Sequence, residues 1–473
     1  MSLFRTSNTS MEETKRKLSN LWNRIMARST AVLTIALFST AMALAMAATD
    51  NGRPPQNTQS HPNPTPVSGS MDVIATTTAA PMEAPAGFDG QPNGLVDSAT
   101  HGMDAGVFSE VEDAAGGLGP LFNAQSCREC HQTPAVGGVS QVTELRVGYV
   151  DGRGNFTNPN ITIGDGSVTI ANRSLVNDRA MCPSADYPAN EVQEHAPDHV
   201  NVRTLRTSLN TLGDGFIEAI PSSAIVDIAN KQCRNTNGQV CGQVIQVPVA
   251  EAPGQTRVAR FGWKNQHASL LSFSADAYLN EMGVTSRLQP TDLTTLCKNT
   301  TDPEDHQDAD GNSDIDRFAR FMRASKVPSR DSNLTNTTDA LAGAAIFDRI
   351  GCDTCHVPTI VTAPTGSVIN GGTLVVPDAL GNKIIHPYSD FLLHNVGTGD
   401  GIVQNGGPAT AQKLRTPPLW GVRLRSRFLH DGRALTFTEA IRAHDNEGSH
   451  AVRGFFNLSD QEKQQLLTFL KSL

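Results

Sequence analysis

The stretch Cys127-Arg128-Glu129-Cys130-His131 places two cysteines three positions apart and a histidine directly after the second. One short turn of chain can then aim both thiols at the vinyl groups of a porphyrin, while the histidine supplies an axial nitrogen to the iron. The pattern returns at Cys352-Asp353-Thr354-Cys355-His356. A zinc site made of two Cys-x-x-Cys halves would leave both histidines unexplained. We therefore predict two covalently bound haem c groups on Cys127, Cys130, Cys352 and Cys355, with His131 and His356 as proximal iron ligands.

The composition limits the class of protein. The chain has 473 residues, a formal net charge of −9 and 18% charged residues. An acidic balance of this kind argues against nucleic acid as a partner. With 40 Gly and 27 Pro, the chain is expected to be loop-rich and globular, and it shows no internal repeat beyond the two haem motifs.

The N-terminus has the features of an export signal. An apolar run over residues 31–48 follows several basic residues, and Ala45-Met46-Ala47 is a small-x-small cleavage site. We interpret residues 1–48 as a signal peptide and the mature protein as periplasmic. The alternative is an uncleaved anchor, which would be the only source of contact with a membrane.

The remaining chain is predicted to be mainly α, with two cytochrome c-like haem domains and β-hairpin insertions. Residues 49–87 are rich in proline and poor in large apolar residues, which is typical of a disordered linker. Residues 88–310 are assigned to an N-terminal haem domain with a β insertion. Residues 311–473 are assigned to a C-terminal haem domain, beginning with a helix near Asp316.

Two local patterns carry the secondary-structure prediction. Between residues 142 and 170, apolar residues alternate with polar ones on both sides of a Gly-containing turn, which predicts a β-hairpin. Near the C-terminus, Ser459 and Glu462 form a capping box ahead of an apolar stripe, which predicts a terminal helix.

Four cysteines lie outside the haem motifs. In an exported chain, an even remainder suggests two disulfides. Cys233 and Cys241 bracket an Asn-Gly turn, so that pairing is the first choice, and it leaves Cys182 for Cys297. The alternative is that these cysteines are free and buried.

An acidic segment over residues 308–314 places oxygen-bearing side chains at every second position, as in calcium-binding loops. The glycine and glutamate that an EF-hand needs are missing. Calcium is therefore a candidate cofactor beside the haems, and the alternative is a solvated acidic linker.

Several longer motifs show a resemblance to a known family. The chain resembles the di-haem oxidoreductases of the peroxidase type, which are relatives of bacterial di-haem cytochrome c peroxidases and of the enzyme that matures methylamine dehydrogenase. The resemblance covers residues 88–473 and rests on the segments Gly119–Asn123, Arg260–Lys264, Gly351–Pro358, Pro387–His394, Arg415–Gly421 and Leu429–Ala434.

This resemblance implies roles for three further residues. By its offset from Glu439, His444 matches the residue that reaches the distal side of the second haem, and a histidine there implies a bis-histidine iron. Trp263 matches a tryptophan between the two haems, and Glu281 matches an acid beside the reactive haem. The alternatives without a functional role are that His444 is a surface residue of a helix and that Trp263 is an ordinary buried tryptophan.

Other residues of the resemblance point away from a direct role. The glutamine that the peroxidases keep ten residues before Glu281 is Leu271 here, which weakens the case for efficient peroxide turnover. His394 and His430 lie in family motifs, and His430 is expected to hydrogen-bond rather than to bind iron. His195, His199 and His267 are expected to be non-ligands.

Three functions compete at this point. The first is a peroxidase that takes electrons from a small redox protein or a quinol-linked donor and passes them from the C-terminal haem to a reactive N-terminal haem, where hydrogen peroxide or oxygen binds. The second is an oxidase or oxygenase of an organic or protein substrate. The third is a di-haem electron carrier without catalysis.

Overall fold

The computed structural model describes residues 72–164, 166, 168–182, 192–294, 296–298 and 300–473. The predicted signal peptide and residues 49–71 of the predicted linker lie outside these residues. Among the described residues, no helix is long and apolar enough to cross a membrane.

The described chain mixes helices with many short strands, so the prediction of a mainly α fold is confirmed only in part. The described helices are α2 (Ser98–Ser109), α3 (Cys127–Cys130), α5 (Asp214–Glu218), α6 (Ser222–Asn235), α7 (Leu270–Met282), α8 (Asp314–Ala324), α9 (Thr338–Arg349), α10 (Phe437–Arg442), α11 (Ser449–Phe456) and α12 (Asp460–Ser472). Short 3-10 turns include Cys352–Thr354 and Asn446–Gly448.

The strands form small separate sheets. Around the first haem motif they are β2 (Leu121–Phe122), β3 (Thr143–Val150), β4 (Phe156–Thr157), β5 (Ile161–Ile163), β6 (Val168–Ile170), β7 (Leu175–Val176), β8 (Arg179–Ala180), β9 (Glu194–His195) and β10 (Val202–Thr207). β3 is the centre of this insertion because it pairs with β4, β7 and β10. The alternation between residues 142 and 170 thus gives strands as predicted, but the long partner of β3 is β10.

The remaining strands lie in the C-terminal half or link the N-terminus to it. They are β1 (Met82–Glu83), β11 (Gln246–Pro248), β12 (Thr256–Val258), β13 (Ile360–Val361), β14 (Val368–Ile369), β15 (Leu374–Val375), β16 (Lys383–Ile385), β17 (Leu393–His394) and β18 (Leu414–Arg415). Except for the parallel β1–β16 pair, their pairings are antiparallel.

Residues 72–87, which the sequence analysis places in the linker, are joined to the rest of the fold. β1 pairs in parallel with β16, and Val73 forms a bridge with Val368. The carboxylate of Asp72 lies 2.8 Å from Nε of the buried Arg257. Backbone pairing and a buried ion pair therefore fix this end of the predicted linker.

Helix α8 packs with the first haem motif, although it begins the predicted C-terminal domain. Its Ser313–Asp316 capping box starts the helix, and Ile315, Phe318 and Met322 give it an apolar stripe. This stripe packs in the same core as α2 and α7. The predicted domain boundary at residue 310 therefore does not coincide with a boundary between hydrophobic cores, because α8 packs in the core of the first motif.

The second haem motif has its own helical core. α9 and α12 pack closely, and the rings of Phe347 and Phe469 lie 5.3 Å apart at their centres. A Cβ on Gly343 would lie 2.1 Å from the carbonyl oxygen of Gln465, so only glycine permits this close contact. The predicted terminal helix is confirmed as α12, and its capping box is present.

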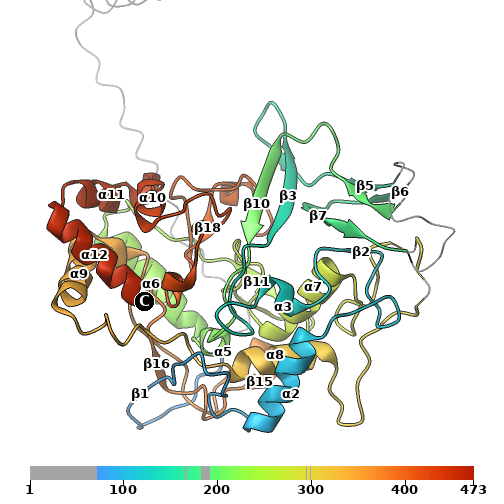
Figure 1. Cartoon of the computed structure of the whole chain (residues 1–473), viewed down its shortest axis with the longest axis horizontal. Coiled ribbons are helices and arrows are strands. Elements are labelled where there is room, and N and C mark those ends of the chain that lie inside the picture. Colours follow the sequence, from blue (N-terminus) through green and yellow to red (C-terminus); the bar gives the residue numbers. More distant parts are fainter. Residues whose placement is uncertain (1–71, 165, 167, 183–191, 295, 299) are drawn as a thin grey trace, which may run out of the picture. The chain divides into compact units, whose positions relative to one another are not determined.

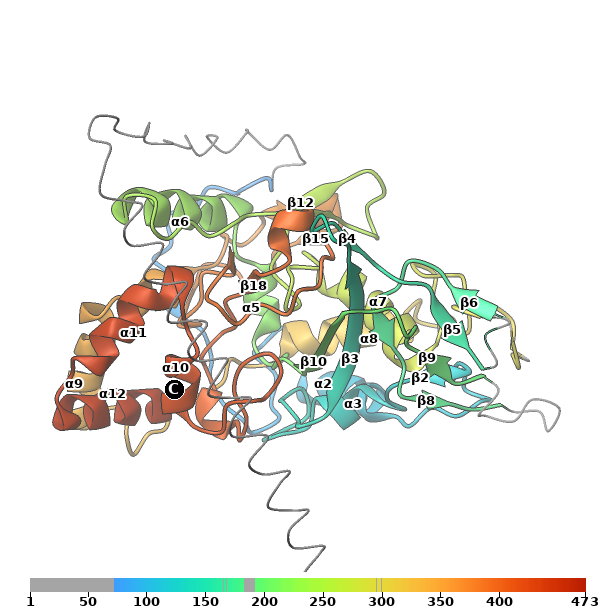
Figure 2. The same cartoon turned by 90° about the horizontal axis from the view of Figure 1, so that it is seen from above.

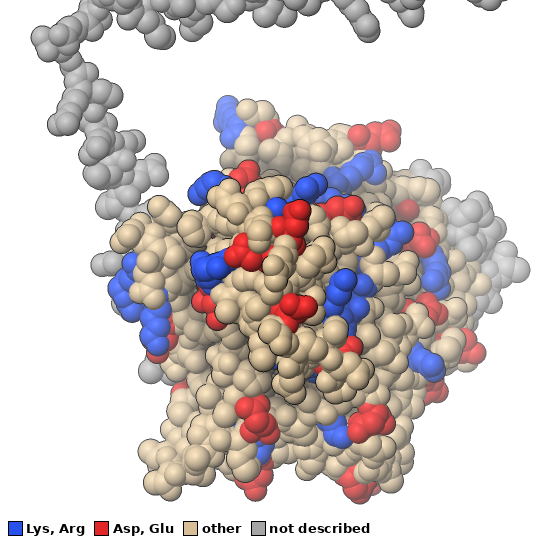
Figure 3. Space-filling model, turned by 60° about the vertical axis from the view of Figure 1, so that its left-hand side comes forward, with Lys and Arg blue, Asp and Glu red and all other residues tan. Residues whose placement is uncertain are grey.

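Figures 1 and 2 both place α9, α11 and α12 at one end of the described fold and β5 and β6 at the other, with α2, α3, α7, α8 and β3 between them. Figure 3 brings the end with α9, α11 and α12 forward and shows charges of both signs scattered among uncharged residues.

Both predicted disulfides, Cys182–Cys297 and Cys233–Cys241, are present.

Candidate haem sites

The first haem motif forms a short helix whose two cysteines are free. Cys127 and Cys130 begin and end α3, and both are half-buried. The Nδ1 atom of His131 lies 3.3 Å from the carbonyl oxygen of Gly138. This contact leaves Nε2 as the ring nitrogen available to a metal.

The second motif repeats this arrangement. Cys352 and Cys355 are free and half-buried, and Nδ1 of His356 lies 3.0 Å from the carbonyl oxygen of Tyr388. Burial lowers the pKa values of His131 and His356 to about 4. Both rings are therefore neutral at physiological pH, as a metal-ligating imidazole must be.

His444 lies near His356. It follows α10, and its Nδ1 atom lies 2.8 Å from the carbonyl oxygen of Ala440. Burial lowers the pKa of His444, and its proximity contributes to the low pKa of His356. Among the described histidines, only His131, His356 and His444 have a ring nitrogen that bonds to a backbone carbonyl. A hydrogen bond of this kind commonly fixes the orientation of a histidine whose other ring nitrogen binds a metal.

A chamber lies beside the first motif, and Cys127, Cys130 and His131 form part of its wall. Most of the rest of the wall is apolar and comes from distant parts of the chain: Phe108, Phe261, Phe273, Phe318, Met322 and Trp420. Such a lining suits the faces of a porphyrin.

Two arginines in the chamber suit the anionic edge of a haem. Arg415 and Arg425 both line the chamber, and burial lowers the pKa of each to about 10. Arg425 donates to the carbonyl oxygen of Ser208 at 3.0 Å. Neither forms an ion pair with a described acidic residue, so both guanidinium groups are available to carboxylates of a bound cofactor. The residues present therefore fit a covalent haem at this motif.

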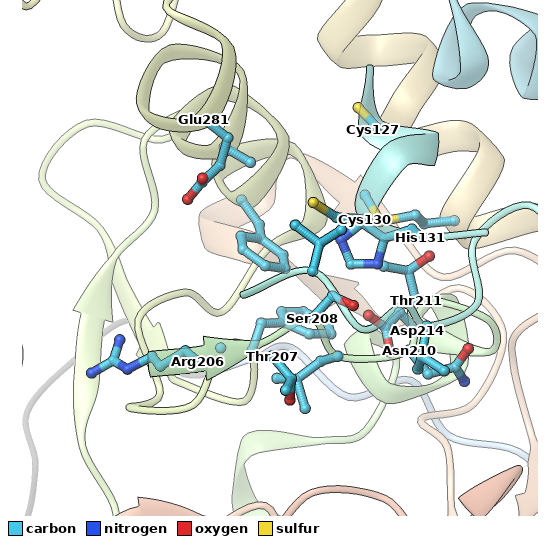
Figure 4. A pocket seen from close by; sticks show the side chains of 18 of the residues that line it. Cys127, Cys130, His131, Arg206, Thr207, Ser208, Asn210, Thr211, Asp214 and Glu281 are labelled. Carbon is cyan, nitrogen blue, oxygen red and sulfur yellow. The ribbon is translucent and has the colours of Figure 1, made fainter. Parts of the chain in front are cut away.

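Glu281 lines the same chamber, and Figure 4 shows its carboxyl across the chamber from the ring of His131. Asn123 donates to it at 2.7 Å, and Arg146 lies 4.0 Å away. Burial and then the negative charge of Glu144 raise the pKa of Glu281 to about 8. Glu281 is thus protonated at neutral pH and can donate a proton inside the chamber.

Trp263 also lines the chamber. Its Nε1 donates to the carbonyl oxygen of Thr207 at 2.8 Å, and its ring lies edge-on to His430 with centres 6.2 Å apart. The bridging role implied for Trp263 stays a prediction. Trp420 is a second aromatic candidate, because Trp420 lines the chamber while its neighbour Leu419 packs against the core of the second motif.

The sequence analysis missed the charged wall of the chamber. Glu144 and Arg146 of β3 and Arg206 of β10 line it beside Glu281. The signal was present in β3, where charged residues alternate with Leu145 and Val147, but polar alternate positions in a strand normally indicate a face in water. Leu271, which replaces the expected glutamine, packs against the core.

The other histidines have other partners. His394 lies 2.8 Å from both Asp390 and Glu447, and His267 lies 3.1 Å from Asp276. His430 faces Thr204 at 3.2 Å. Neither these three nor His195 and His199 line the chamber.

The acidic loop at 308–314 uses its oxygens internally. The carboxylate of Asp308 accepts backbone N–H groups of Asp310 and Asn312 at 2.8 and 3.0 Å, and it pairs with Arg317. A second acidic group, formed by Asp292, Asp302 and Glu304, surrounds the ammonium of Lys298. Neither arrangement supports the predicted calcium, which stays a prediction.

Comparison of the sequence with protein families identifies the class. Residues 193–473 match the family described as "Di-haem oxidoreductase, putative peroxidase". The match covers more than half of the chain, so the protein belongs to this family of di-haem oxidoreductases and is an enzyme of that class. The matched part contains Trp263, Glu281 and the second haem motif, whereas the first motif and β3 precede it.

Comparisons with other proteins add little to this. No curated protein matches the chain. Among solved structures, hydrazine synthase of Kuenenia stuttgartiensis is 14% identical, with 86% of this chain and 100% of that chain covered and a TM-score of 0.34. A MauG-like protein associated with microbial copper homeostasis is 16% identical, with 84% and 94% covered and a TM-score of 0.30. A variant of the diheme peroxidase BthA from Burkholderia thailandensis is 15% identical, with 85% and 92% covered and a TM-score of 0.36. At these scores the likenesses support no conclusion about activity.

Proposed function

We propose that this di-haem oxidoreductase is a periplasmic peroxidase that passes electrons from the C-terminal haem to a reactive N-terminal haem. The observation that carries the proposal is the asymmetry of the two sites. His356 has a second imidazole close by, that of His444, whose Nδ1 atom also bonds to a backbone carbonyl oxygen. Across the chamber from His131 lies instead the acidic side chain of Glu281. Two imidazoles suit a closed electron-transfer iron, whereas one imidazole and an acid suit an iron that binds and cleaves peroxide.

The proposed reaction needs two electrons and two protons to convert one hydrogen peroxide into two waters. The haems supply iron that binds peroxide and relays the electrons. The chain supplies the attachment cysteines, the neutral histidines and a proton on the carboxyl of Glu281. Burial and the negative charge of Glu144 raise the pKa of Glu281, which keeps the proton on Glu281 at neutral pH.

The electron donor and the location are part of the proposal. A small redox protein or a quinol-linked donor would reach the second haem, and Trp263 or Trp420 would assist transfer onward. The mixed charges in Figure 3 favour a donor that docks without strong electrostatic steering. The paired cysteines and the haem c motifs both suit an oxidising compartment outside the cytoplasm.

The test is the spin state of the oxidised protein combined with its reaction with peroxide. The proposal expects one high-spin and one low-spin haem in the EPR spectrum, and rapid oxidation of the reduced protein by hydrogen peroxide in stopped flow. Two low-spin haems without a peroxide reaction would make the protein an electron carrier. A reaction with oxygen but not with peroxide would favour an oxidase or oxygenase.

A further inference from the structure

The charged wall of the chamber and the acid Glu281 beside it come from two different parts of the chain. Glu281 lies on α7, inside the part of the chain that matches the family, but Glu144 and Arg146 lie on β3, ahead of that part. The inserted sheet therefore adds charged groups to a site whose acid belongs to the family portion.

The geometry of β3 fixes these groups. Residues two apart in a strand point to the same face, so Glu144 and Arg146 face the chamber while Leu145 and Val147 pack in a separate apolar cluster. Arg146 holds Glu144 through two bonds of 2.7 and 3.0 Å. The strand register sets Arg206 of β10 directly opposite Glu144, with its guanidinium 4.0 Å from the carboxylate.

The carboxyl groups of Glu144 and Glu281 line the same chamber, and Arg146 reaches both, at 2.7 Å from Glu144 and 4.0 Å from Glu281. Two neighbouring carboxylates repel each other when both are ionised, so one of them favours keeping a proton. Burial would raise the pKa of Glu144, but the charges of Arg146 and Arg206 outweigh burial and lower it. The proton therefore lies mainly on Glu281. The charged and titratable groups around the pair are Arg146, Arg173, Arg206, Asp276 and Cys130.

We propose that the inserted strand completes the reactive site: Glu144 and Glu281 share one proton and act on peroxide as a base and an acid at once, with Arg146 holding the pair. The inference rests on the proposed function, since it specifies how the same site moves protons. Arg146 is a positioning residue, and it also offsets the negative charge of the pair.

This step conserves protons. The ionised carboxylate of the pair takes the proton from the inner oxygen of hydrogen peroxide. The protonated carboxyl gives its proton to the outer oxygen, which leaves as water when the O–O bond breaks. The pair ends with the single proton that it had at the start, and the two electrons come from the haems and their donor.

A shared proton predicts a particular pH dependence. The pair holds one proton until pH rises through about 8, the pKa of Glu281. Above that pH no acid remains, so the rate should fall by about tenfold for each pH unit. A lone glutamate that must first accept the proton of peroxide behaves in the opposite way, because its rate rises as it ionises. A lone Glu281 that only donates its proton would give the same fall as the pair, so the profile of a variant without the Glu144 carboxyl separates these two cases.

The experiment measures stopped-flow oxidation of the reduced holoprotein by hydrogen peroxide from pH 6 to 10, for wild type, Glu144→Gln and Glu144→Asp. Wild type should show a rate that falls with rising pH. Glu144→Gln should reverse the slope, and Glu144→Asp, which keeps the second carboxyl, should restore the fall. Glu110→Gln, which removes an exposed carboxylate beyond the chamber, should match wild type. Intact mass and the Soret band verify that each variant carries both haems.

An infrared measurement tests the pair without turnover. The C=O stretching band of one protonated carboxyl should vanish when wild type is taken through pH 8, and both Glu144→Gln and Glu281→Gln should alter it at neutral pH. If Glu144→Gln keeps the falling pH profile and the same band, Glu281 acts alone and the inference is wrong. If wild type shows the band but no reaction with peroxide, the proposed function is wrong while the shared proton stands.

Discussion

The same pentapeptide pattern is used twice, and the two sites differ in what the chain places opposite each histidine. His356 sits within the helical core of the C-terminal half, among aromatic rings, with His444 nearby. His131 adjoins a chamber with an apolar wall and a charged wall. The two attachment motifs are therefore alike, and in the proposed function the segments far away in sequence decide whether each iron is closed or open to a substrate.

Removing either haem should have the largest effect. Cys127→Ala with Cys130→Ala should lower the intact mass by one haem and abolish the peroxide reaction, because no reactive iron remains. Cys352→Ala with Cys355→Ala should also lower the mass by one haem but leave the first site able to bind cyanide. Mass spectrometry and ligand titration make the measurement. Two haem adducts on either double variant would contradict the assignment of the motifs.

Glu281→Gln should slow the peroxide reaction at neutral pH by about 10²-fold or more, the usual scale of lost general acid–base catalysis. The amide keeps the shape of the side chain but cannot donate the proton that burial holds on Glu281. Stopped-flow absorption gives the rate, with Glu110→Gln as the control for the same substitution outside the chamber. Equal rates in wild type and Glu281→Gln would mean that another group is the acid.

His444→Ala should affect the second haem and leave the first unchanged. Loss of the second imidazole should convert one low-spin EPR signal of the oxidised protein to high spin and raise that haem's reduction potential, since nitrogen ligands favour ferric iron. Potentiometric titration measures the second effect. A spectrum identical to wild type would remove His444 from the ligand set.

The smallest expected effect concerns the donor. Charges of both signs are scattered over the end with α9, α11 and α12, so steering should be weak. Raising the ionic strength from about 0.05 to about 0.5 M should change the rate of electron uptake from a small redox protein by less than about tenfold. Steady-state oxidation of the donor checks this. A much steeper loss would indicate a concentrated charged docking surface at another face.

Local patterns predicted the parts of the structure that depend on local chemistry. The haem motifs, the Cys233–Cys241 disulfide, the strands between residues 142 and 170 and the terminal helix each follow from spacing or capping within a few residues. The Cys182–Cys297 disulfide, whose cysteines are 115 residues apart, was predicted only as the pairing that remained. His444 lies near His356, and its role as a ligand of the second haem stays a prediction.

The parts that were missed depend on long-range packing. An amphipathic stripe predicts that α8 is buried, but it does not reveal that α2 and α7 are the partners. Charged residues at alternate positions of β3 have the pattern of a solvated face, and only the arrangement of α7 against the sheet turns that face into a chamber wall. The low hydrophobicity of residues 72–87 suggested a free linker. The pairing of β1 with β16 could not be predicted, because backbone hydrogen bonds leave no pattern in the sequence.

The ion pair between Asp72 and Arg257 sets a limit on how far the N-terminal segment can be shortened. Arg257 and Arg260 are both fully buried, and Asp72 is the described carboxylate that pairs with Arg257. A protein trimmed just before Asp72 keeps that partner, whereas one trimmed just after it leaves two neighbouring guanidinium groups without it. Loss of one partner from a buried pair costs about 3–5 kcal/mol. Any shortening of the N-terminal segment must therefore stop short of Asp72 if the protein is to keep this stability.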